Sequence, residues 1–139
     1  MRVLLLEVGQ DSYALAVETV DRVMAVPPVT RVPGASPAVL GVFNLRGEIV
    51  PLFDLPRLIG TGETAGGSHV AVVRSPRGLA GLLASAAPVV AELGDPVAGI
   101  EGAGGRSIHD VEGHLASYVD IDEYFAAEDP ALQGTGAGP

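Results

Sequence analysis

Short apolar runs separated by turn-forming residues recur along this chain of 139 residues. The first two, over residues 2–8 and 13–17, are joined by Gly-Gln-Asp-Ser, a combination typical of a β-hairpin. Because such runs return about every 8 to 12 residues, with brief helical turns between some of them, they predict an all-β protein of barrel type. The expected strands cover residues 2–8, 13–17, 41–44, 48–53, 70–74, 79–84, 89–93, 107–111 and 115–119, and one more that follows a short helical turn and ends before Pro27.

Brief helices are expected at the corners of this fold. Asp54 is a typical N-cap residue, and Pro56 stands at an early helical position, so a short helix should end at Ile59. Residues 38–40 and 121–125 each predict one further helical turn.

Segments rich in Pro or Gly predict the loops. Residues 27–37 contain four prolines, which favour a rigid loop without ladder hydrogen bonds. Residues 61–68 are polar and Gly-rich, and we expect a flexible connector there that divides a domain over residues 1–127 into two subdomains. Residues 94–106 predict a second Gly-rich loop. The Gly-Ala-Pro tail, residues 128–139, should be disordered.

The residue types that are missing exclude several classes of chemistry. There are no cysteines, so disulfides, thiolate metal sites and cysteine nucleophiles are excluded. There is also no lysine, which excludes a phosphate-loop lysine and a Schiff base. No run approaches the roughly 18 apolar residues of a membrane span, and we expect a cytoplasmic protein without direct membrane insertion.

The net charge of −9 is unevenly distributed along the chain. Residues 1–91 hold seven arginines against seven acidic residues, whereas residues 92–139 hold one arginine against ten acidic residues. Because nucleic-acid binding depends on a basic surface, this balance argues against a nucleic-acid partner. The acidity is typical of a solvated surface that aids solubility.

None of the catalytic or metal-binding patterns is complete in this sequence. Residues 60–65, GTGETA, resemble a dinucleotide fingerprint, but they follow a predicted helix where the fingerprint requires a strand. His109 and His114 lie on either side of a predicted hairpin turn, and no fourth ligand is implied beside them and their acidic neighbours. The G-x-S-x-G nucleophile motif is absent. We therefore expect a protein that is not an enzyme and has no metal or cofactor site.

Residues 41–55, GVFNLRGEIVPLFDL, place one polar turn between two apolar runs. Asn44 and Gly47 are the residues preferred at the first and fourth positions of a type I turn, and Gly47 would take the left-handed conformation as a bulge residue. Arg46 would be held at the exposed tip, where its planar, always-charged guanidinium suits a carboxylate of a partner. Both alternating faces of the flanking runs are apolar, so we expect both faces to be covered.

The same run resembles the signature of the CheW-like domain of chemotaxis coupling proteins, whose usual form is G-hydrophobic-I-N-L-R-G-x-hydrophobic-V-P-hydrophobic-hydrophobic-D-L. The match is long and ordered. Tyr13-Ala14-Leu15, Pro33-Gly34 and Val119-Asp120-Ile121-Asp122 also fall where that family has similar residues. The resemblance extends over residues 2–126, which is nearly the whole chain.

This resemblance implies two small five-stranded, SH3-like β-barrels packed against each other. It also implies a non-enzymatic signal-transduction adaptor that bridges the regulatory domain of a chemotaxis-type histidine kinase and the cytoplasmic tip of a chemoreceptor. The residues that match the partner-binding positions of the family are Asn44, Arg46 and Gly47 in the motif and, more loosely, Val20, Val23 and Met24 in an apolar groove.

Three other interpretations remain open at this point, and one of them is that the motif is retained only for folding. After residue 83 the family commonly has an apolar-acidic stretch, whereas this chain has Ala84-Ser85-Ala86-Ala87-Pro88, so its second barrel is divergent. A divergent accessory copy would bind one partner without bridging two. A small-molecule-binding barrel would require a pocket lined by convergent polar groups.

Overall fold

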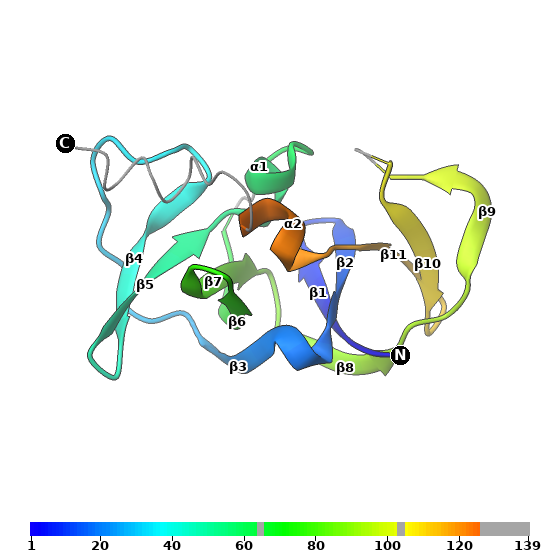
Figure 1. Cartoon of the computed structure of the whole chain (residues 1–139), viewed down its shortest axis with the longest axis horizontal. Coiled ribbons are helices and arrows are strands. Elements are labelled where there is room, and N and C mark those ends of the chain that lie inside the picture. The colour runs from blue at the N-terminus through cyan, green and yellow to red at the C-terminus, as the bar shows by residue number, and fades with distance from the viewer. Residues whose placement is uncertain (64–65, 103–104, 126–139) are drawn as a thin grey trace.

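The computed structural model describes residues 1–63, 66–102 and 105–125. Figure 1 shows two lobes built of strands, with helices present only as short turns. One lobe contains β1 (Arg2–Val8), β2 (Asp11–Ala16), β8 (Val89–Glu92), β9 (Pro96–Glu101), β10 (Ser107–Val111) and β11 (His114–Tyr118). The other contains β3 (Val20–Ala25), β4 (Val39–Leu45), β5 (Glu48–Phe53), β6 (His69–Ser75) and β7 (Gly78–Ala84). The helical turns are η1 (Val17–Thr19), α1 (Leu55–Ile59) and α2 (Ile121–Phe125).

Each lobe is one curled sheet. The six-stranded sheet has the order β8-β1-β2-β11-β10-β9, and the five-stranded sheet has the order β3-β6-β7-β5-β4. The predicted all-β fold of two packed barrels is confirmed, with six strands in one lobe instead of five. The additional strand is β9, which lies within the expected loop at residues 94–106 and pairs irregularly with β10.

In each lobe, the segment that follows one edge strand is hydrogen-bonded to a strand at the far side of the same sheet. In the five-stranded lobe, Thr30 pairs with Val42 of β4, so the segment after β3 lies against the far edge of the sheet. In the six-stranded lobe, the Gly94 N–H donates to the Asp110 carbonyl at 2.8 Å, which places the segment after β8 against β10. These contacts pair backbone groups that an open sheet edge would leave exposed.

The chain passes between the two sheets at η1 and again at residues 85–88, between β7 and β8. Residues 61–68 join α1 to β6 and lie between two strands of the same sheet, β5 and β6. The predicted division at residues 61–68 therefore coincides with neither passage between the sheets. Loop composition suggests where the chain can turn, but strand pairing decides which segments share a sheet.

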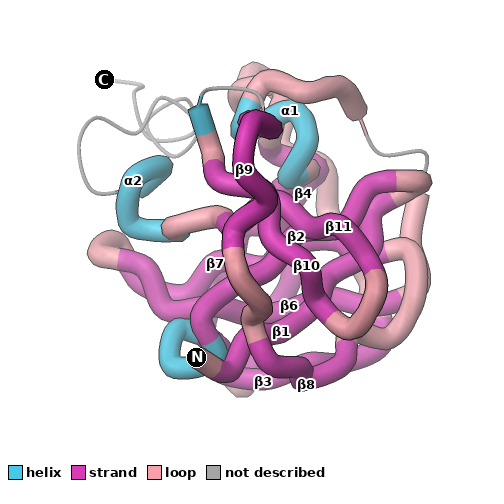
Figure 2. The backbone as a smooth tube through the Cα atoms, turned by 90° about the vertical axis from the view of Figure 1, so that its right-hand side faces the viewer, coloured by secondary structure: helices cyan, strands magenta, loops and turns pink. Residues whose placement is uncertain are grey.

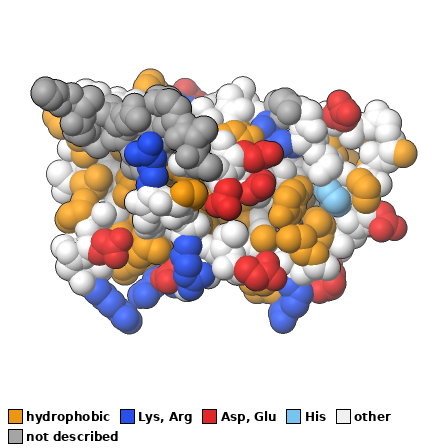
Figure 3. Space-filling view, viewed as in Figure 1, with side chains coloured by type: hydrophobic (Ala, Val, Ile, Leu, Met, Phe, Trp, Pro, Cys, Tyr) orange, Lys and Arg blue, Asp and Glu red, His pale blue; other side chains and the backbone are white. Residues whose placement is uncertain are grey.

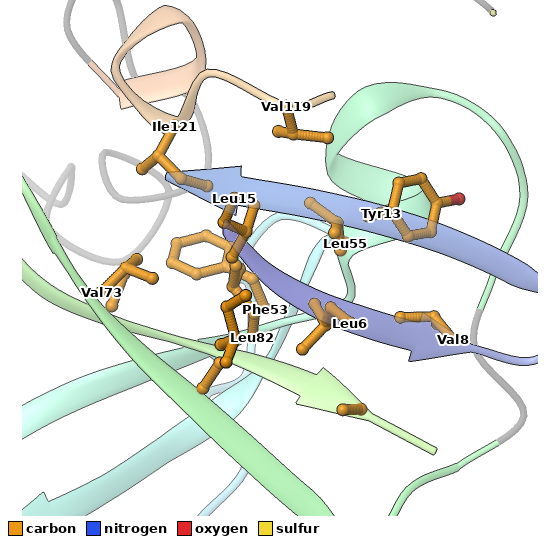
Figure 4. Packing of buried hydrophobic residues seen from close by; sticks show 14 of the residues in the cluster. Leu6, Val8, Tyr13, Leu15, Phe53, Leu55, Val73, Leu82, Val119 and Ile121 are labelled. Atoms are coloured by element: carbon orange, nitrogen blue, oxygen red, sulfur yellow. The ribbon is translucent and has the colours of Figure 1, made fainter. Parts of the chain in front are cut away.

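The largest buried cluster lies between the lobes (Figure 4). It packs Leu6 and Leu15 of the six-stranded lobe against Phe53 and Leu82 of the five-stranded lobe. Phe125 of α2 meets the Phe53 ring edge-on, with the ring centroids 5.1 Å apart. Because burying one such side chain contributes roughly 1.5 to 3 kcal/mol, this shared core holds the lobes together as one unit.

The two faces of the β4–β5 hairpin are covered unequally, so the prediction that both are covered is wrong for the outer face near the tip, where Ile49 is 61% exposed. Phe43, Val50 and Leu52 fill the interior of the five-stranded lobe. Phe53 points the other way, into the core between the lobes. The hairpin therefore connects the barrel interior with the surface on which the second lobe packs.

The short helix after this hairpin forms as predicted. Asp54 is buried, and its Oδ1 accepts a hydrogen bond from the Arg57 N–H at 3.3 Å. Gly60 closes the helix with a positive φ of 84°. Both ends of α1 thus have the caps that the sequence indicates.

The predicted helical turns at residues 38–40 and 121–125 have different outcomes. Residues 38–40 are not helical, because β4 already begins at Val39 and the Ala38 carbonyl accepts a hydrogen bond from the Asp54 N–H. The helical turn at residues 121–125 is confirmed as α2. The predicted tail at residues 128–139 lies outside the described residues. No helix in the described ranges has the length and apolarity needed to cross a membrane.

Candidate protein-interaction surface

The tip of the β4–β5 hairpin is a two-residue loop. Leu45 pairs with Glu48, so only Arg46 and Gly47 stand between the strands. Both residues have positive φ, 53° at Arg46 and 88° at Gly47, which is the pattern of a type I′ turn. The predicted type I turn with a bulge is therefore wrong, although the left-handed Gly47 is confirmed. A type I′ turn is favoured because its twist matches that of the flanking strands.

Asn44 and Arg46 have different roles in this turn. The Asn44 Oδ1 accepts a hydrogen bond from the Gly47 N–H at 2.9 Å, so Asn44 braces the loop. Arg46 is exposed, and its guanidinium forms no hydrogen bond or ion pair with any of the described residues. A non-glycine residue in the left-handed region costs roughly 1 to 2 kcal/mol. Arg46 therefore carries backbone strain that no side-chain bond within the described chain offsets.

Beside this tip, two arginines hold Asp21 of β3. The Asp21 Oδ2 lies 2.8 Å from the Arg22 Nε, and its Oδ1 lies 3.4 Å from the Arg74 Nη2. The hydrogen bond from Arg22 lowers the pKa of Asp21 below its usual value, and the charges of Arg22, Arg74 and Arg46 lower it further. Because Arg46 acts on Asp21 through its charge, the hairpin tip and the start of β3 form one charged surface.

Strand directions explain why the arginines gather at one end of the five-stranded lobe. β5 and β7 run parallel, so the loops that precede them, which carry Arg46 and Arg77, lie at the same end. β3 runs antiparallel to β6, so Arg22 near the start of β3 lies beside Arg74 near the end of β6. Figure 3 shows arginine side chains gathered at the lower left, with acidic side chains among them.

The predicted groove residues Val20, Val23 and Met24 do not face the same way. Val20 is half-buried and packs against the core between the lobes, whereas Met24 packs against the interior of the five-stranded lobe. Val23 is 38% exposed. Side chains alternate along a strand, and the register of β3 shifts between Val20 and Arg22. Of these three residues, Val23 reaches the surface most fully.

Four exposed apolar side chains lie on or directly after β3 and on β8, and we call this set the β3–β8 strip. Its members are Val23, Val26, Val89 and Val90, with exposures between 36% and 54%. Figures 1 and 2 both place β3 and β8 along the lower side of the molecule. The Val26 N–H donates to the Ser68 carbonyl, and the Ser68 N–H donates to the Ala84 carbonyl, so hydrogen bonds link the end of β3 to the segment that leads into β8.

Sequence reasoning missed Val89 and Val90 as surface residues. Consecutive valines in a short apolar run look the same as a strand buried on both faces. The signal that identifies them is Pro88, because proline removes a ladder donor and is typical of edge strands. Ile49, which is 61% exposed near the hairpin tip, was missed for a similar reason. Contiguous exposed apolar patches are typical of interaction sites, and these side chains are therefore the candidates for one.

The histidines considered as metal ligands have other surroundings. The His109 Nδ1 donates to the Gly94 carbonyl at 2.9 Å, and its Nε2 lies 2.9 Å from the Ser107 hydroxyl. His114 is exposed at the start of β11. Within the described ranges, no group of three His, Cys, Asp or Glu side chains is arranged to hold a metal ion.

Comparisons with known proteins agree with this architecture. The sequence model of the CheW-like domain family matches residues 2–129. The chain is 27% identical over 132 residues to the chemotaxis protein CheW of Rhizobium meliloti, which covers 88% of this chain and 85% of that protein. It is 38% identical over 56 residues to the chemotaxis protein CheW of Bacillus subtilis, covering 40% of this chain and 36% of that protein. Its fold resembles the scaffolding protein TtCheW of Thermoanaerobacter tengcongensis, with a TM-score of 0.72 and 21% identity over 94% of this chain and 91% of that one.

Proposed function

The chain belongs to the CheW-like domain family and is a chemotaxis adaptor, and on that premise we propose that it couples a chemoreceptor to a histidine kinase. The receptor partner is the cytoplasmic tip of a helical coiled coil, and the kinase partner is the regulatory domain. The protein acts in the cytoplasm through binding surfaces and without catalysis.

The observation that carries this proposal is the position of the β3–β8 strip beside the arginine-rich end of the five-stranded lobe. The strip offers apolar side chains, and its two strands lie on different lobes that are fixed by a common core. The tight β4–β5 turn that carries Arg46 lies on the same lower side of the molecule. An amphipathic helix binds such a surface by laying its apolar face on the strip.

Electrostatics favours Arg46 as the polar contact. Arg22 and Arg74 are already bonded to Asp21, so binding a new carboxylate there would disturb existing ion pairs. The Arg46 guanidinium has no such bond within the described residues. An acidic side chain on the receptor helix can therefore pair with Arg46 at little cost inside the adaptor, and a bidentate pair would also fix the orientation of the helix.

A charge reversal at the hairpin tip tests the receptor contact. Arg46→Glu should leave the free energy of unfolding within about 0.5 kcal/mol, as exposed substitutions usually do. Its affinity for a receptor-tip fragment, measured by calorimetry, should fall by about 2 to 5 kcal/mol if the contact is partly desolvated. The matched control is Glu112→Arg, which reverses a charge at the corresponding turn position of the other lobe. Equal affinity of Arg46→Glu and the wild type would refute the receptor contact.

Coupling requires that both partners bind at once. The receptor fragment and the kinase regulatory domain should form a ternary complex with the adaptor, visible as one species by size-exclusion chromatography with light scattering. If the two partners displace each other, the protein is instead an accessory copy that binds one partner at a time.

A further inference from the structure

A cavity of 370 Å³ opens on the outer face of the six-stranded sheet. It is lined by residues of β2, β9, β10 and β11, and by Thr61, which follows α1. None of the residues of the β3–β8 strip lines the cavity, and neither does Arg46. Cavities of roughly 300 to 1,000 Å³ are the usual size of small-molecule sites.

Strand register assembles the floor of this cavity. Tyr13 of β2 lies opposite Ser117 of β11, and Ser117 lies opposite Ile108 of β10, so the three form one row across the sheet. Because side chains alternate along a strand, Asp11 and Leu115 fall on the same face as this row. The neighbouring residues on the opposite face, among them Ala14 and Ala116, belong to the interior of the barrel.

The lining divides into an apolar part and a charged part. Ile100, Ile108 and Leu115 supply apolar surface, and two of them stay uncovered, with Ile100 at 47% and Leu115 at 58% exposure. Asp11, Glu101 and Arg106 supply charges of both signs, and hydroxyls of Tyr13 and Thr61 lie between the lobes at 3.3 Å from each other.

The charged side chains that line the cavity are not all engaged in bonds with the described residues. The carboxylates of Asp11 and Glu101 form no hydrogen bond or ion pair with the described residues. Arg106 donates from one terminal nitrogen to the Tyr124 hydroxyl, which orients its guanidinium. Its Nε is buried and has no hydrogen-bond partner in the described part of the chain. A buried N–H of this kind normally has a partner.

A negative and a positive side chain both act on the Tyr13 phenol in the cavity. Burial raises the pKa of Tyr13, the hydrogen bond with Thr61 opposes the shift, and Asp11 and Arg106 act on the phenol in opposite directions. A simple anion would be repelled by the two carboxylates, and a simple cation would be repelled by Arg106. A ligand that carries both charges avoids each repulsion.

From these features we propose that the cavity binds a small free amino acid with an apolar side chain. The ammonium group is held by Asp11 and Glu101, and the carboxylate is held by Arg106. The apolar side chain covers Ile100, Ile108 and Leu115. This site is independent of the proposed receptor contact, because it uses none of the same residues.

Calorimetry with the full chain and L-leucine tests the site. L-leucine should bind in the millimolar range or tighter, and 3-methylbutylamine and 4-methylpentanoate, each lacking one of the two charged groups, should bind at least about tenfold more weakly, as expected for loss of a hydrogen bond to a charged group. Asp11→Asn and Glu101→Gln should each weaken L-leucine binding by a similar factor. Glu48→Gln, an exposed change on the other lobe, is the control and should bind like the wild type.

Several results of these measurements would overturn the proposal. No heat or chemical-shift change with L-leucine at millimolar concentration overturns the proposal. The proposal also fails if the amine or the carboxylate alone binds as tightly as L-leucine, or if Asp11→Asn and Glu101→Gln both bind like Glu48→Gln. Arg106 is kept out of the primary test because its bond to Tyr124 gives it a structural role as well.

Discussion

Arg46 and Glu112 occupy the same position in two nearly identical turns, one in each lobe. Their φ angles are 53° and 52°, and the glycines that follow them, Gly47 and Gly113, have φ angles of 88° and 87°. In each turn the residue two positions before the strained one accepts a hydrogen bond from the glycine N–H. The two turns thus have the same backbone geometry but carry opposite charges. Comparing variants at the two positions therefore separates the effect of the turn conformation from the effect of the side chain.

This pairing predicts that Arg46→Asn will stabilise the protein. Asn is preferred over Arg at the first loop position of a type I′ turn, because it tolerates positive φ at lower cost. The free energy of unfolding should rise by about 0.5 to 1 kcal/mol, as measured by urea denaturation, while affinity for the receptor fragment falls.

Glu112→Asn is the control for this prediction. It relieves the same strain and should raise the stability by a similar amount without any change in receptor affinity. If Arg46→Asn were less stable than the wild type while Glu112→Asn gained stability, Arg46 would be a structural residue, and the assignment to a partner would be lost.

Two glycines of the same hairpin should respond differently to alanine. Gly47→Ala places a Cβ in open space, so only the positive φ opposes it, and the expected loss is about 1 kcal/mol. At Gly41 the Cβ would lie 2.6 Å from the Thr30 carbonyl oxygen and 2.5 Å from a Val29 methyl group. The Thr30 carbonyl is part of the backbone that closes the barrel, so it cannot easily move aside. Gly41→Ala should therefore lower the free energy of unfolding by about 2 to 3 kcal/mol or more. Equal denaturation midpoints for the two variants would contradict this account.

The strands that were predictable from the sequence are those with local signals. The hairpin over residues 41–55 has turn residues at its tip and apolar residues on both faces, and both features appear in the structure. Asp54 and Pro56 likewise mark the start of α1 by local chemistry. Where neighbours in the sequence decide the structure, the prediction holds.

The features that were missed depend on distant pairing. Pro96 and Gly99 are typical of loops, and β9 forms around them only because β10 lies beside it. The turn type at Arg46 follows from the pairing of Leu45 with Glu48, which residue preferences alone do not specify. The β3–β8 strip joins residues more than sixty positions apart, so no local pattern could reveal it.

The charged surface around Asp21 should give an acid-dependent stability. The pKa of Asp21 is lower in the folded protein than its ordinary value of 3.8, mainly because of the hydrogen bond from Arg22. The unfolded chain therefore binds the proton more readily, and the ionised Asp21 stabilises the fold above about pH 4. This contribution is lost as the pH falls through the lower folded value.

Asp21→Asn should accordingly be less stable than the wild type near neutral pH, and the difference should shrink below pH 3.8. Denaturation midpoints at a series of pH values measure it, and high salt should reduce the difference because the ion pairs are partly exposed. Glu48→Gln serves as the charge-change control. A difference between Asp21→Asn and the wild type that does not vary with pH would show that Asp21 acts through packing and not through its charge.

Two similarly exposed apolar residues, one in each proposed binding surface, provide the last test. Val89 in the β3–β8 strip is 54% exposed, and Leu115 in the cavity is 58% exposed. Val89→Asp and Leu115→Asp should each change the stability by no more than about 0.5 kcal/mol, because neither side chain is part of a buried core. Val89→Asp should weaken binding of the receptor fragment by about tenfold or more, since a carboxylate at an apolar contact must be desolvated. Leu115→Asp should leave that affinity unchanged and weaken L-leucine binding instead. Calorimetry of both variants with both ligands checks this, and a loss of receptor affinity from Leu115→Asp equal to that from Val89→Asp would place the receptor surface elsewhere.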